Sequence, residues 1–244
     1  MSTAVLTKRI AEASPGFIAR MAGACEILEG LTSTFGQVIV VNKLVVHADA
    51  AATAANILAH ETLFRLGFAS ALIGVAFHIA WTLLFYELFK PVNRSLSLLA
   101  AFVGLVGCSL LAFASLFYIA PLAVLGHSQY LGAFTLAHQQ ALALIFLNLN
   151  GQAFNIFLVF FGLRMLMTGY LIFRSTFLPR IFGVLLAIDG LGWMLYLDPP
   201  LANHLFMFIA IASALAEIPL PWWLLIRGVH VERWKEQAGE AGVI

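Results

Sequence analysis

The sequence predicts an all-α membrane protein: a polytopic transmembrane helical bundle with six spanning helices, two interfacial helical segments and both termini in the cytoplasm. Composition is the first observation behind this prediction, because 62% of the 244 residues are apolar and only 10% are charged. Soluble domains carry about 25% charged residues, so a soluble globular fold is essentially excluded. The second observation is that the apolar residues form runs near the ~20 residues that a helix needs to cross ~30 Å of hydrocarbon.

Helix-start and helix-stop signals set the bounds of the expected spans. Ser14 can cap a helix, and Pro15 lacks only an amide that the first turn would leave unbonded, so a helix should begin here. Proline cannot continue a helix, and Pro91 and Pro121 are therefore expected to end later spans. The expected spans are residues 17–41, 62–88, 96–119, 150–172, 181–197 and 205–226. Together they form a single transmembrane domain over residues 1–244.

Weaker segments lie between and after the spans. Asp49 can cap a short alanine-rich helix over residues 50–61, which is too weakly apolar to span and is expected at the interface. Residues 126–148 are semi-polar and are expected to be interfacial as well, at least in their first half. The tail over residues 227–244 is dominated by charged residues and is expected to be an exposed cytoplasmic helix. Within the last span, Pro219 predicts a kink.

Basic residues are distributed unevenly between the two sides of a six-helix threading. One side holds nine of them: Lys8, Arg9, Lys90, Arg94, Arg174, Arg180, Arg227, Arg233 and Lys235. The other side holds two, Lys43 and Arg65. Because lysine and arginine are enriched in cytoplasmic loops, this bias predicts that both termini are cytoplasmic.

Several partners and motifs are disfavoured by the sequence. A net charge of +1, without a basic patch interleaved with aromatic residues, argues against a nucleic-acid partner. The expected partner is the lipid bilayer, with other membrane subunits left open. Cys25 and Cys108 both fall in apolar helices and are expected to be small core residues. The sequence has no glycine-rich phosphate loop, Ser-His-Asp grouping or Cys-x-x-Cys pair, so no cofactor and no catalytic residue is assigned.

A basic turn over residues 174–180 joins two apolar helices and places an arginine and an aspartate at matching depth. Arg164 lies ten residues before the turn begins, and Asp189 lies nine residues after it ends. At ~1.5 Å rise per residue, both lie roughly 14–15 Å from the turn, near the middle of the hydrocarbon. A charge there costs ~2.5–3.5 kcal/mol even on the lenient insertion scale, so the two are candidates to neutralise one another.

Other spans carry ionisable groups at the same depth. Glu26, His78 and Glu217 each lie about ten residues from the cytoplasmic end of their helix. Arg164 is the only fixed cation at this level, so at least one acid is expected to be protonated or to share a proton with His78. The five residues Glu26, His78, Arg164, Asp189 and Glu217 therefore predict a ligand- or proton-binding site. A structural polar lock that only fixes helix register is the alternative interpretation.

Histidines gather on the side opposite the basic turns, and they raise the question of a metal. His47, His60, His127, His138 and His204 are all expected there, near Glu61 and Asp198. Imidazole and carboxylate groups are zinc ligands, and the weak candidates are His60, Glu61, His138 and His204. Their spacing matches no local metal motif such as His-Glu-x-x-His, which leaves the metal unidentified. Haem is disfavoured because His78 is the only deep histidine.

Five segments of the chain carry a family resemblance. The longest is FFGLRMLMTGYLIFRSTFLPRIFGVLLAIDGLGW at residues 160–193, and the others are residues 51–67, 88–97, 140–147 and 223–228. Together they resemble the bacterial membrane family of the domain of unknown function DUF4386. The resemblance implies a multi-spanning protein of the bacterial cytoplasmic (inner) membrane and implies no established activity. Glu26 and Glu29 depart from the usual apolar first helix, so the resemblance assigns them no role.

Three hypotheses about function follow. The first is a bundle whose buried charged layer binds a small or lipidic ligand or protons, as in a transporter or a sensor. The second is an accessory or assembly subunit of a larger membrane complex, which needs only helices, a polar lock and short loops. The third is a metal-dependent intramembrane hydrolase that uses the outer-face histidines. The sequence favours a non-enzyme and names no substrate.

Overall fold

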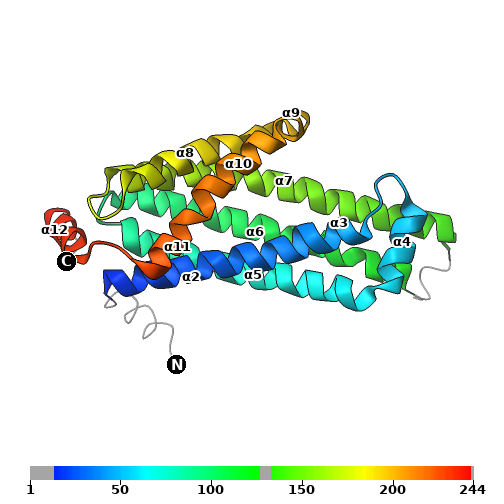
Figure 1. Ribbon diagram of the computed structural model, residues 1–244. Coiled ribbons are helices and arrows are strands. Elements are labelled where there is room, and N and C mark those ends of the chain that lie inside the picture. Colours follow the sequence, from blue (N-terminus) through cyan, green and yellow to red (C-terminus); the bar gives the residue numbers. More distant parts are fainter. Residues whose placement is uncertain (1–13, 127–132, 243–244) are drawn as a thin grey trace, which may run out of the picture. The chain divides into compact units, whose positions relative to one another are not determined.

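The computed structural model describes residues 14–126 and 133–242, and every regular element in these ranges is helical. In chain order the elements are α2 (Pro15–Ser33), the π-helix η1 (Thr34–Val40), α3 (Val41–Leu44), α4 (Ala50–Ala59), α5 (Glu61–Phe89), α6 (Arg94–Leu125), α7 (Leu136–Arg174), α8 (Arg180–Met194), the 3₁₀ turn η3 (Leu195–Leu197), α9 (Pro199–His204), α10 (Phe206–Glu217), α11 (Pro219–Ile226) and α12 (Val231–Glu240) (Figure 1).

Six stretches within the described residues are long and apolar enough to cross a membrane. They are Pro15–Leu44, Glu61–Phe89, Arg94–Leu125, Leu136–Arg174, Arg180–Leu197 and Phe206–Ile226. The predicted all-α class and the six spans are thereby confirmed, and the chain is a multi-pass membrane protein. One of the two expected interfacial segments corresponds to the short apolar helix α4.

Two predicted helix starts are confirmed in their capping geometry. The Ser14 hydroxyl accepts a hydrogen bond from the Phe17 amide at 3.3 Å, where α2 begins. The Asp49 carboxylate accepts one from the Ala52 amide at 2.8 Å, where α4 begins. Each cap satisfies an amide that the first turn of a helix leaves without a partner, which explains why these local signals were reliable.

The second expected interfacial segment is wrong as a separate element. Residues 136–174 form one continuous helix of 39 residues, α7, without a break before the predicted span at residue 150. Asn150, where the predicted span begins, is buried, and its Nδ2 donates to Gln37 Oε1 at 3.1 Å. The Asn150 amide nitrogen thus has a partner distant in sequence, while its Oδ1 has none among the described residues, and the helix continues.

Pro121 does not end the third span as predicted. α6 continues through it to Leu125. Proline removes one backbone hydrogen bond and kinks or breaks many helices. Here Val124 and Leu125 are both buried, and Leu125 belongs to a hydrophobic core. Burial of the final turn therefore offsets the lost bond.

The kink predicted in the last span is confirmed. α10 ends at Glu217 and α11 begins at Pro219, so the span is made of two helices that meet at Ile218. Proline lacks the amide that would continue the hydrogen-bond ladder of α10, which accounts for the break.

Packing divides the chain into two compact units. Unit 1 comprises Met1–Ile27, Phe77–Gly107 and Leu158–Ile244, and unit 2 comprises Leu28–Ala76 and Cys108–Phe157. Helices α2, α5, α6 and α7 contribute residues to both units. Each unit has a hydrophobic core of its own.

Close backbone contact between α7 and α8 organises unit 1. A Cβ at Gly162 would lie 2.5 Å from the Gly190 carbonyl oxygen, and a Cβ at Gly183 would lie 2.5 Å from that of Gly169. Side chains are therefore excluded at these crossing points. Small residues that let helix backbones approach are a common way to join helices in membranes, where lipid tails are as apolar as the side chains.

Unit 2 has a core in which a tyrosine joins three segments. The Tyr118 ring stacks on Phe64 with ring centroids 4.8 Å apart. Its hydroxyl donates to the Gly36 carbonyl at 3.1 Å. Gly36 lies in the π-helix η1, where wider turns change the pairing of backbone carbonyls. The tyrosine thus ties α6 to the π-helical part of the first span.

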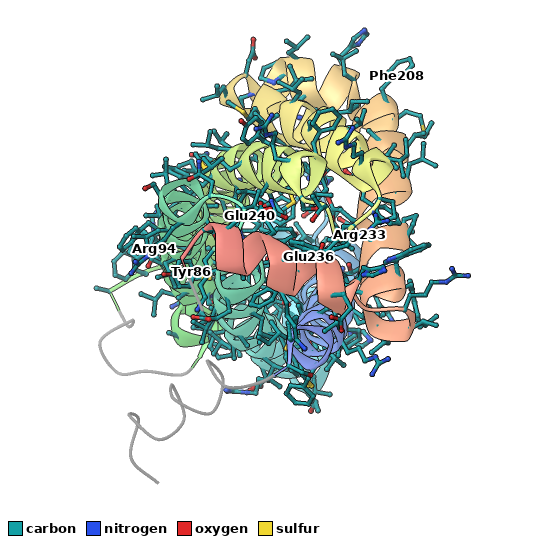
Figure 2. All side chains as sticks on the ribbon, turned by 90° about the vertical axis from the view of Figure 1, so that its left-hand side faces the viewer. Tyr86, Arg94, Phe208, Arg233, Glu236 and Glu240 are labelled. Atoms are coloured by element: carbon teal, nitrogen blue, oxygen red, sulfur yellow. The ribbon has the colours of Figure 1, made fainter. Side chains whose placement is uncertain are left out.

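The two basic turns and the tail meet at one end of unit 1. Trp234 Nε1 in α12 donates to the Leu88 carbonyl at 2.8 Å, and the His230 amide donates to the Phe177 carbonyl at 3.2 Å. Figure 2 looks onto this end, with α12 lying across it. The tail helix is exposed over most of its residues, as expected, and it is anchored by the buried Trp234. Its orientation relative to the membrane remains a prediction, and Lys8 and Arg9 lie outside the described residues.

Candidate functional site

Arg164 of α7 is buried in unit 1, with 2% of its surface exposed. Its Nη1 atom lies 2.8 Å from His78 Nε2 on α5, and its guanidinium carbon lies 3.8 Å from the centroid of the Trp81 ring. A guanidinium can only donate, so His78 must accept at Nε2 and is neutral in this contact, with its proton on Nδ1. The Trp81 ring adds a cation–π contact that stabilises the buried charge.

A small cavity adjoins the arginine. It has a volume of about 10 Å³ and is lined by residues of α5, α6 and α7 that include Thr82, Ser97 and Thr168. That is room for about one water molecule. Thr82 Oγ1 is buried without a hydrogen-bond partner among the described residues, and one water in the cavity would supply it. The space does not admit an organic ligand.

A second polar group of unit 1 is acidic. Asp189 of α8 has 0% of its surface exposed, and its Oδ1 atom accepts a hydrogen bond from the Ser213 hydroxyl of α10. The carboxyl group of Glu217, one turn further along α10, accepts from Trp193 Nε1 at 2.8 Å. The Asp189 and Glu217 carboxyl groups face each other at hydrogen-bonding range. Polar groups from two helices thus converge on this carboxyl pair.

One buried oxygen of the carboxyl pair, Asp189 Oδ2, receives no hydrogen bond from the described residues. Two carboxylates in contact away from water repel each other and lack the donors that each needs. A proton on either carboxyl group would remove the repulsion and supply the missing donor. The geometry therefore suits a pair that holds a proton.

Glu26 approaches the carboxyl pair from the first span. Its side chain in α2 is 8% exposed, and its charge acts on Glu217 of α10. Three acids from three helices, α2, α8 and α10, are therefore within electrostatic range in unit 1. Glu217 is itself half-buried, unlike Asp189.

All five site residues predicted from depth lie in unit 1. They fall into two groups: His78 with Arg164, and Glu26 with Asp189 and Glu217. An ion pair between Arg164 and Asp189, which their equal depth suggested, is not among the contacts that the described residues give to Asp189. Whether these residues act in function is still a prediction.

Sequence reasoning missed three residues that contact the site. They are Trp81, Trp193 and Ser213. A signal for each was present, because residues three or four apart share a helix face. Each lies at that spacing from a predicted site residue: Trp81 from His78, Trp193 from Asp189 and Ser213 from Glu217.

The metal candidates are not brought together. Within the described ranges there is no group of three or more His, Cys, Asp or Glu side chains placed to hold a metal ion. His60 Nδ1 lies 3.1 Å from the Asn56 carbonyl, and the Glu61 carboxylate forms an ion pair with Arg65 at 2.7 Å. His138 and His204 are exposed. His127 lies outside the described residues.

Comparison with known proteins places the chain in a family. The family model described as "Domain of unknown function (DUF4386)" matches residues 21–228, and the chain belongs to this family. No curated protein and no solved structure matches the chain. The family resemblance of the hairpin and its companion segments is thereby confirmed, and the family's description assigns no activity.

Proposed function

We propose that this DUF4386 protein is a proton-linked transport or sensing protein of a bacterial cytoplasmic membrane, and that the Asp189–Glu217 carboxyl pair binds the proton. The observation that carries the proposal is the interaction of the buried Asp189 carboxyl group with the half-buried Glu217, with Asp189 Oδ2 lacking a donor among the described residues. Ionisable groups inside a membrane are expensive, and they mark proton relays in many pumps and transporters.

Available space favours a proton over a larger ligand. The cavity beside Arg164 has a volume of about 10 Å³, enough for about one water. Around the carboxyl pair, the Ser213 hydroxyl already donates to Asp189 Oδ1, and Trp193 Nε1 already donates to Glu217 Oε1. A proton needs no cavity of its own, whereas a solute or an acyl chain does.

Charge balance in unit 1 supports the same function. Arg164 is a permanent cation, and its contact with His78 leaves that ring neutral. One carboxylate balances the arginine, so the three acids Glu26, Asp189 and Glu217 carry two protons between them when the buried groups are neutral overall. Glu26 of α2 is a further acid within electrostatic range of Glu217 and a candidate for proton exchange.

Infrared spectroscopy of the full-length protein in lipid bilayers tests the proposal. We expect a carbonyl stretching band from a protonated carboxylic acid, which Asp189→Asn and Glu217→Gln each weaken or shift. Glu240→Gln is the matched control, because Glu240 is an exposed carboxylate on α12 and should not contribute. Absence of the band from the wild type, or a band that neither variant changes, would contradict the proposal.

A pH titration of the same band separates proton handling from a structural lock. In a proton-handling site, the band intensity changes reversibly with pH while the helical circular dichroism stays constant. A polar lock holds its proton at every pH at which the protein stays folded. A band that is constant over the whole folded range would therefore favour the lock.

A further inference from the structure

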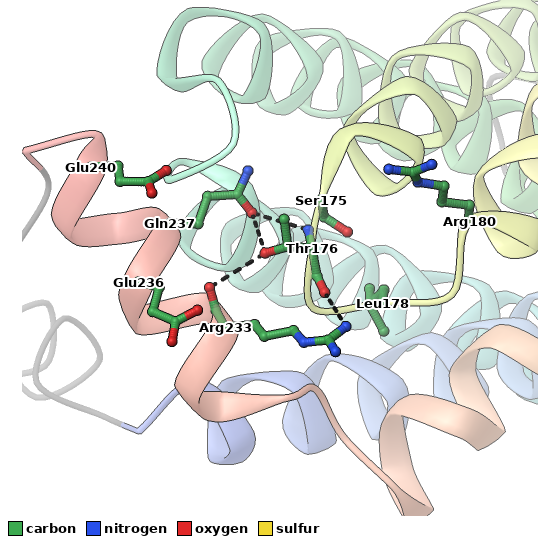
Figure 3. A pocket seen from close by; sticks show the side chains of 8 residues that line it. All are labelled: Ser175, Thr176, Leu178, Arg180, Arg233, Glu236, Gln237 and Glu240. Carbon is green, nitrogen blue, oxygen red and sulfur yellow. Dashed lines mark hydrogen bonds between the residues drawn. The ribbon is translucent and has the colours of Figure 1, made fainter.

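A polar pocket of about 540 Å³ lies at the end of unit 1, between the turn that joins α7 to α8 and helix α12 (Figure 3). Its lining residues are Ser175, Thr176, Leu178, Arg180, Arg233, Glu236, Gln237 and Glu240. The pocket shares no residue with the buried carboxyl pair, so a ligand there is independent of the proton-binding proposal.

Hydrogen bonds hold the two walls of the pocket together. The amide and hydroxyl of Thr176 both donate to Gln237 Oε1, each at 3.2 Å. Arg233 Nη1 donates to the Thr176 carbonyl at 3.4 Å. Ser175 and Leu178, which also line the pocket, are buried. The hollow is therefore a built feature between two tied segments.

The pocket has charged side chains of both signs: Arg180 on α8, and Arg233, Glu236 and Glu240 on α12. Figure 3 shows Arg180 at the start of α8, across the pocket from Glu236 and Glu240 on α12. Arg180, Glu236 and Glu240 form no ion pair within 4 Å in the described part of the chain. Two arginines and two glutamates balance, so neither a simple anion nor a simple cation is favoured. A ligand that carries both charges matches the pocket.

The position of the pocket indicates the kind of ligand. α7 ends at Arg174 and α8 begins at Arg180, so the pocket lies where two spans end, at the level of lipid headgroups. The ring of Phe173 lies 5.7 Å from the Arg180 guanidinium carbon and is 45% exposed. Ile181, just inside α8, is 57% exposed. Apolar surface therefore adjoins the charged pocket, as a ligand with a charged head and apolar tails requires.

We propose that this pocket binds the headgroup of a zwitterionic phospholipid that carries a primary ammonium group, that is, a phosphoethanolamine headgroup. The phosphate lies between Arg180 and Arg233, because guanidinium groups bind phosphate oxygens in a bidentate manner. The ammonium group donates to the carboxylates of Glu236 and Glu240. A quaternary ammonium would need an aromatic cage, and the described lining residues include no aromatic side chain.

Native mass spectrometry of the full-length protein in mild detergent tests this site. The probes are phosphatidylethanolamine, phosphatidylcholine and phosphatidylglycerol with identical acyl chains. We expect phosphatidylethanolamine to be retained several-fold better than the other two lipids. Arg180→Gln and the double variant Glu236→Gln/Glu240→Gln should each remove that preference. Lys235→Gln is the matched control, because Lys235 is an exposed charge on α12 that does not line the pocket.

Folding is controlled within the same experiment. The side chains of Arg180, Glu236 and Glu240 donate and accept no hydrogen bond in the described residues, whereas Trp234 and Gln237 anchor α12. The variants should therefore keep the wild-type tryptophan fluorescence, to which Trp234 contributes. A variant that loses it is replaced by Arg180→Lys, which keeps the charge and loses only the bidentate contact, and which should weaken binding by a smaller factor.

Three results would overturn the proposal. Retention of phosphatidylglycerol above phosphatidylethanolamine, increased further by the double glutamine variant, would show an anion site. Equal retention of phosphatidylcholine would show that the ammonium group is not recognised. Soluble phosphoethanolamine that competes at the same concentration as the lipid would show a site for a free solute, since the adjoining apolar surface should favour the lipid.

Discussion

The two units of this membrane protein bury different kinds of polar group. Every buried acid, histidine or arginine in the described residues, namely Glu26, His78, Arg164 and Asp189, belongs to unit 1. The buried polar side chains of unit 2 include the neutral Thr53, Ser115 and Asn150. Both units are built from similarly apolar helices, and α2, α5, α6 and α7 contribute to both. Overall composition therefore does not determine where charge is buried.

The energetic consequence of this difference is large. Neutral hydrogen bonds between membrane helices contribute about 0.6 kcal/mol on average. A buried charge has a much higher desolvation cost, and removing one partner from a buried charged group costs about 3–5 kcal/mol. The buried charged groups of unit 1 thus have a high desolvation cost, and removing one of their partners strongly destabilises the fold. Unit 2 has the contacts that a purely structural bundle needs. This contrast is the reason for seeking function in unit 1.

The largest effect is expected where α7 crosses α8 in unit 1. In Gly162→Leu, the new side chain would collide with the Gly190 carbonyl oxygen, because a Cβ at position 162 would lie only 2.5 Å from that atom. Overpacking costs about 1–3 kcal/mol even when side chains can move, and backbone cannot yield as easily. We expect loss of the folded, monodisperse protein in size-exclusion chromatography.

The control for this change lies on the same helix in unit 2. Gly151 of α7 has no neighbour within 4 Å of an added Cβ, so Gly151→Leu should be tolerated. If both leucine variants stay folded, close backbone packing is not what joins α7 to α8. If both variants unfold, the two units do not differ in how well α7 tolerates an added side chain.

An intermediate effect is expected from Arg164→Leu. The substitution removes the contacts to His78 and Trp81 and leaves the acids of unit 1 without their permanent counter-charge. The free energy of unfolding should fall by about 3 kcal/mol, measured by thermal unfolding in detergent. Asn150→Leu in unit 2 removes a neutral bond to Gln37 and should cost about 1 kcal/mol. Equal losses in the two variants would remove the energetic contrast between the units.

The smallest effect is expected from Tyr118→Phe in unit 2. This variant keeps the stacking on Phe64 and removes only the hydrogen bond to the Gly36 carbonyl. We expect a loss of about 1 kcal/mol in unfolding free energy. Hydrogen exchange should increase locally at the amides of η1. If Tyr118→Phe lowers the unfolding free energy as much as Arg164→Leu does, the hydrogen bond to the π-helical turn stabilises the protein more than a single neutral bond should.

The site shows how far depth alone could lead. Counting residues from the basic turns predicted that His78, Arg164 and Asp189 lie at one depth, because helical rise converts sequence distance into depth. Depth does not say which helix faces which. The grouping of Arg164 with His78, and of Asp189 with Glu217, depends on the rotation of each helix about its axis. Packing contacts far apart in the sequence set that rotation.

Local signals succeeded where the physics is local, and they failed where a tertiary partner intervened. Ser14 and Asp49 cap helices through bonds to their own near neighbours, and both were predicted correctly. A span was predicted to begin at residue 150, but α7 is continuous there, and Asn150 Nδ2 donates to Gln37, more than a hundred residues away in sequence. Pro121 was predicted to end the third span, but the turn that follows it is buried and α6 continues through it.

The sequence by itself determined that this is a six-span helical membrane protein with ionisable groups at one depth, because spanning length, apolarity and helical rise are properties of each segment alone. Only the tertiary structure decided that these groups separate into an arginine–histidine contact and a carboxyl pair. It also decided that α12 closes a charged pocket against the α7–α8 turn. Both outcomes depend on which backbones approach closely, and glycines such as Gly162 and Gly190 set that approach through contacts between distant residues.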